Sequence, residues 1–402
     1  MSSDGALAGA AAAIGRRLVD DAVWHDGRCS WIGVVENPAE PWRTKYRALE
    51  GNLYDGTAGV GLFLAQLAVV TGDPSVRRTA VGAMRHAAES SAPVRDGFHA
   101  GRLGIAWAAA RAATLLDEDE LQGHASAATA AGADRCPDVV MGRAGALLAL
   151  LALGDVPVEH TAAIGEELLD QALITTHGWA WPLPDRRHRR PLCGLSHGAA
   201  GIAWALLELY AATGDDRFRA GAEGAFAYER SWLDARSGTW PDLRIGGQRR
   251  GARTRGVSPA AGTWCHGEGG IALTRLRAMD VLGQEPWRPE AELALETTRR
   301  ELADAMPYEI DDLTLCHGAG GAADVLLCGA DALGGPWHKS AQLAYDLGQS
   351  TLERYGRDGG DWPCGLAGHA PPGLFRGLSG IGWWFLRLHD RTVPSPLTMP
   401  SG

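Results

Sequence analysis

The sequence predicts an all-α protein of the α/α toroid class, built from seven helix-pair repeats. A Gly-x-x-Gly frame occurs seven times, and each copy is followed by a run of small or apolar residues. More polar segments with helical spacing lie between these runs. Because a helix that is apolar on all sides must be buried on all sides, we expect seven inner helices in a ring, with seven amphipathic helices around them.

Glycine recurs at the start of each repeat. It accounts for 54 of 402 residues, nearly twice the usual share of roughly 7%. The first glycines of the frames are 41 to 69 residues apart, at Gly56, Gly101, Gly142, Gly198, Gly267, Gly318 and Gly377. A glycine at a helix start permits a tight turn and leaves the first amides of the helix pointing toward one end of the ring.

Apolar and amphipathic segments alternate as a toroid requires. Residues 60–70 and 202–209 are examples of the apolar runs, and residues 74–92 and 289–306 are amphipathic.

The repeats divide the chain into three parts. We predict an N-terminal helical segment over residues 1–44 that packs on the ring, the toroid over 45–390, and a C-terminal tail over 391–402.

Composition excludes several classes of protein. With 46% hydrophobic and 21% charged residues the chain is globular, and its net charge of −10 argues against nucleic acid as the main partner. No apolar stretch reaches the roughly 18 residues of a membrane span. Asp4 precedes the apolar N-terminal run and Arg16 and Arg17 follow it, which is the wrong order for a signal peptide, so we expect a cytoplasmic protein.

Reactive residues stand directly before the first glycine in three frames, and the fourth frame begins with Ser196 and His197. The fifth frame begins with Cys265 and His266, and the sixth with Cys316 and His317. In a toroid these positions converge at one end of the central cavity. Cys265, Cys316 and His317 then form a set of two thiolates and one imidazole, which suits Zn²⁺ with one open coordination position.

The remaining cysteines and His266 have plainer interpretations. We predict that the other cysteines are small buried residues or free thiols; these are Cys29, Cys136, Cys193, Cys328 and Cys364. For His266 two interpretations remain open: an acid or base facing the cavity, or a packed histidine.

In these motifs the chain resembles the lanthionine cyclase family (LanC-like proteins), most closely the cyclase domain of class II lanthionine synthetases. The seven frames, the Trp264-Cys265-His266-Gly267 and Cys316-His317-Gly318 motifs and the LYDGTAG opening carry the resemblance over residues 45–390. It implies a double α-barrel, one zinc ion, and addition of a peptide cysteine thiol to dehydroalanine or dehydrobutyrine, which closes a thioether ring.

The resemblance also implies roles for individual residues. It makes Cys265, Cys316 and His317 the zinc ligands, and it assigns proton transfer to His197 and Asp138, with His266 as a further candidate. A histidine beside a carboxylate suits both removal of the thiol proton and protonation of the enolate carbon. A cap at the start of the third inner helix is the alternative for Asp138.

The chain departs from the family pattern at two positions. Some members have arginine four residues before the first cysteine ligand, where this chain has Ala261, and Arg253 or Arg255 would be the substitutes. Some members have tyrosine at the position of His266.

Two arginine clusters, one within residues 185–190 and one formed by Arg249, Arg250, Arg253 and Arg255, fall in loops before the fourth and fifth frames. They are either solvated loops or a rim that binds an acidic leader or the peptide backbone.

The sequence therefore predicts a zinc-dependent cyclase whose substrate is a dehydrated precursor peptide, with a separate dehydratase, kinase or lyase supplying the dehydrated residues. Two alternatives remain: an enzyme that adds glutathione or another free thiol to dehydrated residues, and a non-catalytic toroid scaffold.

Overall fold

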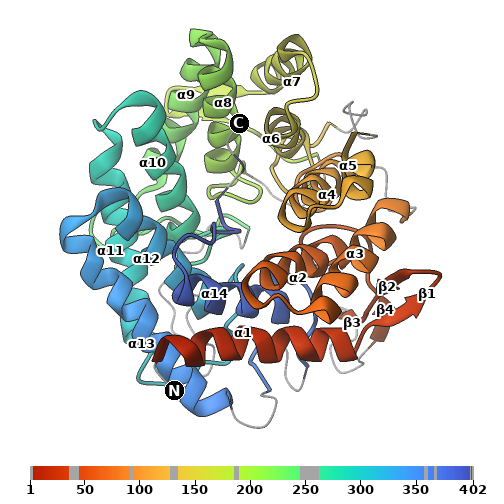
Figure 1. Ribbon diagram of the computed structural model, residues 1–402. Coiled ribbons are helices and arrows are strands. Elements are labelled where there is room, and N and C mark those ends of the chain that lie inside the picture. The colour runs from red at the N-terminus through yellow and green to blue at the C-terminus, as the bar shows by residue number, and fades with distance from the viewer. Residues whose placement is uncertain are drawn as a thin grey trace.

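Helices form a closed ring of two layers (Figure 1), which confirms the predicted toroid. The structure is a computed structural model that describes residues 3–35, 45–90, 95–126, 135–184, 190–244, 262–356, 361–365, 369–398 and 400. The inner layer consists of α2 (Thr57–Thr71), α4 (Arg102–Leu116), α6 (Arg143–Leu153), α8 (Ala199–Thr213), α10 (Glu268–Leu282), α12 (Ala319–Leu333) and α14 (Leu378–His389). Each inner helix contacts the next one, and α14 contacts α2.

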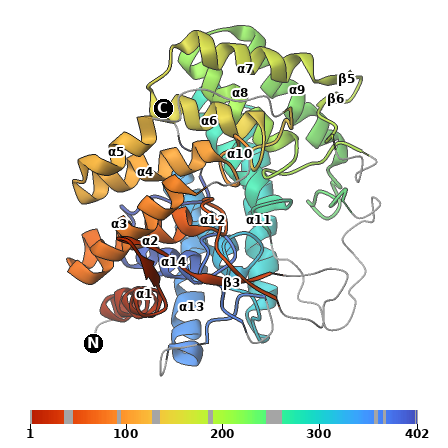
Figure 2. The same ribbon diagram turned by 90° about the vertical axis from the view of Figure 1, so that its right-hand side faces the viewer.

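The outer layer is made of the amphipathic helices. These are α1 (Ser3–Asp20), α3 (Pro74–Glu89), α5 (Asp119–Ser126), α7 (Val158–Asp170), α9 (Asp216–Trp232), α11 (Trp287–Ala305) and α13 (His338–Tyr355), the last preceded by the short 3₁₀ helix Gly335–Trp337. Both views place α7 and α9 at the side of the molecule opposite α1 and α13 (Figures 1 and 2). No helix in the described ranges is both long and apolar enough to span a membrane.

The two ends of the chain complete the ring together. Helix α1 packs mainly against α14, so the N-terminal helix is the outer partner of the last inner helix. Leu7, Ile14 and Leu18 of α1 are buried in this contact region. The seventh helix pair therefore joins residues from opposite ends of the sequence.

The frames have a common geometry. Their first glycine is the N-cap residue of an inner helix in all seven cases. Their second glycine lies against a backbone carbonyl six residues earlier: a Cβ atom on Gly104 would stand 1.5 Å from the oxygen of Phe98, and one on Gly145 would stand 1.9 Å from that of Val139. No side chain fits at such a distance, which explains why glycine recurs at this position.

Backbone hydrogen bonds join the loops that precede the frames, which we call the frame loops. The amide of Tyr54 donates to the carbonyl of His99 (2.9 Å), and the amide of His99 donates to that of Val140 (3.2 Å). The amide of Ser196 likewise donates to the carbonyl of Cys265 (3.0 Å). Because neighbouring loops are bonded directly, the residues before the glycines form one layer at the amino ends of the inner helices.

Short hairpins and the C-terminal segment complete the fold. The hairpins are β1 (Val23–His25) with β2 (Arg28–Ser30), β3 (Ile32–Val35) with β4 (Lys45–Ala48), and β5 (Leu173–Thr175) with β6 (Gly178–Ala180). Near the C-terminus Leu397 is fully buried, and its carbonyl accepts a hydrogen bond from the indole N–H of Trp264 (3.0 Å). Ser395 is hydrogen-bonded to Asp324 of α12, so this segment is packed inside the ring.

Candidate active site

Two cysteines and a histidine meet at the amino ends of α10 and α12. The ligand atoms of Cys265, Cys316 and His317 all lie within 4.8 Å of one another. The two cysteines are 5% and 1% exposed, and His317 is partly buried. In a tetrahedral zinc site with Zn–S bonds of about 2.3 Å the ligand atoms are about 3.5–4 Å apart. The donor set fits zinc, and the 4.8 Å limit on its spacing is close to that of such a site.

The two thiols influence one another. A hydrogen bond from Cys316, together with the positive charge of Arg244, lowers the pKa of Cys265 to about 7 against the opposing effect of burial. Burial and the neighbouring Cys265 raise the pKa of Cys316 well above its usual value. One negative charge thus forms readily near neutral pH, whereas a second thiolate requires a cation beside it. A divalent metal supplies such a charge.

The side chains of His197 and Asp138 form a pair next to the cysteines. His197 Nδ1 lies 2.5 Å from Oδ2 of Asp138. Asp138 is fully buried, and its other carboxylate oxygen accepts a hydrogen bond from the backbone N–H of Met141 (2.8 Å). The N-cap residue of α6 is Gly142, so Asp138 holds the turn before that helix and does not cap it.

The pairing sets the tautomer of His197. Because the Asp138 carboxylate accepts, Nδ1 of His197 carries the hydrogen and Nε2 keeps its lone pair. The His197 side chain is 27% exposed, so a bound molecule has access to it. The geometry is that of a general base whose orientation is fixed by a buried carboxylate.

His266 is a neighbour of this pair. Its ring stacks on that of His197, with centroids 5.7 Å apart and planes inclined by 27°. Its Nε2 atom lies 3.3 Å from the hydroxyl of Ser196. Burial, followed by the positive charge of Arg244, lowers the pKa of His266 well below its usual value. His266 is therefore a buried neutral imidazole that packs beside His197 and hydrogen-bonds Ser196.

Two arginines that the sequence analysis did not single out act on the cysteines. Asp242 holds the guanidinium of Arg244 by two hydrogen bonds, Nε to Oδ1 at 3.0 Å and Nη2 to Oδ2 at 2.7 Å. The charge of Arg244 is one of the causes that lower the pKa of Cys265. The charge of Arg376 partly opposes the rise that burial and Cys265 cause in the pKa of Cys316. Arg376 directly precedes the first glycine of the seventh frame. His197, His266 and His317 occupy the same position in the fourth, fifth and sixth frames, so this position in the sequence could have indicated that Arg376 lies at the site.

Tyr54 of the first frame also belongs to the site. Its hydroxyl donates a hydrogen bond to Sγ of Cys316 at 2.9 Å. In the sequence Tyr54 stands only as part of the LYDGTAG motif, and nothing there relates it to Cys316.

Most of the arginines proposed as a rim lie outside the described residues, and so does the position where an arginine is missing. These residues are Arg186, Arg187, Arg189, Arg249, Arg250, Arg253, Arg255 and Ala261.

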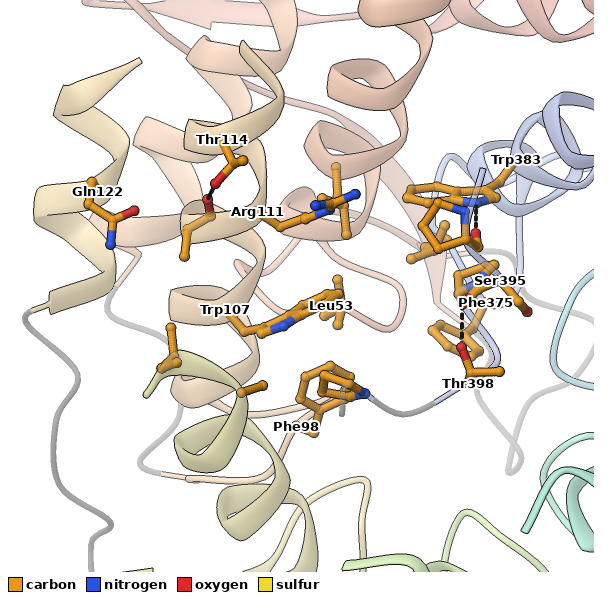
Figure 3. A pocket seen from close by; sticks show the side chains of 18 residues that line it. Leu53, Phe98, Trp107, Arg111, Thr114, Gln122, Phe375, Trp383, Ser395 and Thr398 are labelled. Atoms are coloured by element: carbon orange, nitrogen blue, oxygen red, sulfur yellow. Dashed lines mark hydrogen bonds between the residues drawn. The ribbon is translucent and has the colours of Figure 1, made fainter. Parts of the chain in front are cut away.

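A cavity of about 500 Å³ occupies the ring on the other side of the frame loops. Trp107 and Arg111 of α4 line it together with Trp383 of α14, and so do Phe98 and Phe375 of the frame loops (Figure 3). Ser395 and Thr398 of the C-terminal segment form part of its wall. None of the candidate catalytic or metal-binding residues lines this cavity.

The solved structure of nisin cyclase agrees with this architecture. Nisin cyclase superposes with a TM-score of 0.60 at 18% identity, covering 85% of this chain and 89% of that chain. Cellobiose 2-epimerase from Spirochaeta thermophila DSM 6192 gives a TM-score of 0.46 at 15% identity, with 94% of each chain covered. At these identities the likeness to nisin cyclase concerns the fold.

The sequence itself gives the stronger assignment. Residues 47–398 match the family described as lanthionine synthetase C-like protein. This match includes every frame and each of the candidate site residues described above. The chain therefore belongs to the lanthionine synthetase C-like protein family.

Proposed function

We propose that this protein is a zinc-dependent lanthipeptide cyclase. It would add cysteine thiols of a peptide to dehydroalanine or dehydrobutyrine residues and so form lanthionine or methyllanthionine rings. The observation that supports this most is the cluster of Cys265, Cys316 and His317, with ligand atoms within 4.8 Å of one another, beside the His197–Asp138 pair in a member of this family.

The three clustered residues would hold the metal. Two buried thiols and one imidazole are a donor set that zinc prefers, and three protein ligands leave a fourth position for a substrate sulfur. When bound there, zinc keeps a substrate thiolate nucleophilic at neutral pH.

His197 would move the proton in this reaction. Its Nε2 atom takes the proton of the incoming cysteine thiol, and the sulfur then forms a bond to the β-carbon of the dehydrated residue. The electron pair of the C=C bond moves toward the carbonyl as an enolate, and a proton returned from His197 to the α-carbon completes the thioether. Asp138 holds the imidazole in the required tautomer throughout.

Arg244 would supply the positive charge that stabilises the enolate oxygen. Asp242 fixes its guanidinium, and its charge acts on both cysteines of the cluster. A fixed positive charge aimed at the developing oxyanion lowers the barrier to the addition. Arg244 would thus take the role for which the sequence suggested Arg253 or Arg255.

The substrate would be a dehydrated precursor peptide. The addition consumes an alkene that must first be formed by elimination of water or phosphate from serine or threonine. We therefore propose that a separate dehydratase, or a kinase and lyase, acts before this protein.

The test combines metal analysis with a thiol count. Purified protein should contain one zinc, and incubation with a dehydrated peptide should remove one peptide thiol for each ring formed. Cys316→Ala should lose both zinc and activity. The matched control is Cys29→Ala, which removes a buried thiol bonded to the carbonyl of Thr79 (3.3 Å) on the outer layer and should change neither. Stoichiometric zinc in Cys316→Ala would refute the assignment of Cys316 as a ligand. Consumption of glutathione in place of peptide thiols would refute the proposed cyclase activity.

A further inference from the structure

Tyr54 connects the first frame of the chain to the candidate metal ligand of the sixth. Its hydroxyl lies 2.9 Å from Sγ of Cys316, across a separation of 262 residues in the sequence. The hydroxyl is the donor in this hydrogen bond. The sulfur is therefore the acceptor.

The tyrosine ring is held rigidly in this position. It stacks on Phe375, with centroids 5.2 Å apart and planes inclined by 12°, and the edge of His99 packs against it (6.5 Å between centroids). His99 is fully buried and its ring meets those of Phe98, Trp264 and Phe375 as well. A side chain confined in this way loses little further freedom when it makes a directed hydrogen bond.

Three hydrogen bonds close a loop around the contact. The amide of Phe375 donates to the carbonyl of Tyr54 (2.8 Å), and the amide of Cys316 donates to the carbonyl of Phe375 (2.9 Å). The third bond is that from the Tyr54 hydroxyl to the Cys316 sulfur. The frame loops of the first, sixth and seventh repeats thus fix both the donor and the acceptor.

We propose that Tyr54 is a positioning residue that donates a hydrogen bond to the Cys316 thiolate and thereby limits how much electron density this ligand gives to the metal. The inference rests on the proposed function, because it requires a metal at Cys265, Cys316 and His317. Two thiolates would neutralise a divalent ion and weaken it as a Lewis acid. A hydrogen bond to one sulfur withdraws charge from it and leaves the ion better able to hold a further thiolate.

A charge and a hydrogen bond act differently on the two sulfurs. The guanidinium of Arg244, which is fixed by Asp242, acts through its charge on both sulfurs, whereas the hydroxyl of Tyr54 donates a hydrogen bond to Cys316. The Tyr54 hydrogen bond is directional and acts on one sulfur only. Its removal should therefore change the electronic properties of one metal–sulfur bond without removing a ligand.

The experiment replaces zinc by Co²⁺, whose sulfur-to-cobalt charge-transfer absorption reports on the thiolates directly. In Tyr54→Phe the band should move to lower energy, since the sulfur electrons are no longer stabilised by the hydrogen bond. Zinc affinity, measured by competition with a chelator, should fall by about tenfold, the lower end of the effect usual for partners of this kind. The matched control is Tyr355→Phe, which removes a tyrosine hydroxyl bonded to a backbone carbonyl, that of Ile310 (3.1 Å), in the outer layer.

The outcomes separate this inference from the proposed function. If wild-type protein binds neither Zn²⁺ nor Co²⁺, or if Cys316→Ala keeps the charge-transfer band, the metal site itself is wrong. The inference about Tyr54 is wrong if the band of Tyr54→Phe has the same energy as the bands of wild-type protein and Tyr355→Phe. Failure of folded Tyr54→Phe to bind Co²⁺ even in excess would also overturn it, because all three ligands remain.

Discussion

The Nδ1 atom of His197 lies 2.5 Å from Oδ2 of Asp138, a residue of the preceding frame loop that is fully buried. The carboxylate has no contact with solvent, whereas the imidazole is 27% exposed. The pair therefore presents one nitrogen to the site and anchors the other in the protein. This arrangement gives the histidine a fixed tautomer before any substrate arrives.

Replacement of Asp138 by Asn should damage catalysis and leave the metal in place. The amide keeps the size of the side chain but removes the negative charge that holds the hydrogen on Nδ1. We expect kcat/KM for ring formation to fall about 10²–10⁴-fold, the usual range for loss of acid–base function. Zinc content and the unfolding midpoint, measured on the same sample, should stay close to wild type. Activity within a factor of two of wild type would contradict the assigned role.

Arg244 should control the ionisation of Cys265 in metal-free protein. Loss of its positive charge in Arg244→Ala removes one of the causes that hold the pKa of Cys265 near 7, so less thiolate should form at neutral pH. Ultraviolet thiolate absorbance, corrected by the same titration of Cys265→Ala, measures this. Arg244→Lys should restore part of the effect. The control is Arg217→Ala on α9, whose exposed pairs with Asp215 and Glu166 lie in the outer layer.

Zinc affinity should rise with pH, because the metal displaces protons from its ligands. The pKa of Cys265 is lowered to about 7 and that of Cys316 is raised well above its usual value. Between about pH 7.5 and 8.5 only Cys316 still has to lose a proton, so the apparent association constant should rise about tenfold per pH unit. Below about pH 6.5 both thiols are protonated and the dependence should steepen to about a hundredfold or more per unit. Isothermal titration over this range tests the prediction, and a pH-independent affinity would contradict it.

The second glycine of a frame should tolerate no side chain. In Gly104→Ala the new Cβ atom would stand 1.5 Å from the carbonyl oxygen of Phe98, and backbone cannot yield as a flexible side chain would. We expect the free energy of unfolding to fall by about 3 kcal/mol or more. Gly123→Ala in α5 is the control, since nothing lies within 4 Å of its added Cβ atom. That variant should gain about 0.5–1 kcal/mol. Urea unfolding of both variants and of wild-type protein measures these changes in the free energy of unfolding.

Local sequence determined the repeat and the place of the site on it. An N-cap glycine and an apolar run are properties of a few consecutive residues, so each inner helix could be predicted from its own frame. Because the frames are equivalent, residues at the same position in different frames must share one end of the ring. Cys265, Cys316 and His317 were predicted to converge on this basis alone, and their ligand atoms do cluster.

Contacts between distant frames were decided only by closure of the ring. Nothing local to Tyr54 indicates Cys316, and nothing in α1 indicates that it completes the pair with α14. Arg244 lies outside the frames, and Asp242 fixes the side chain whose charge acts on the cysteines. The periodicity of a helix fixes which residues of one segment face inward, but which partner each one meets depends on the packing of all seven pairs. The sequence therefore determined the candidate ligand set, and the tertiary structure decided the hydrogen bond and the charge that surround it.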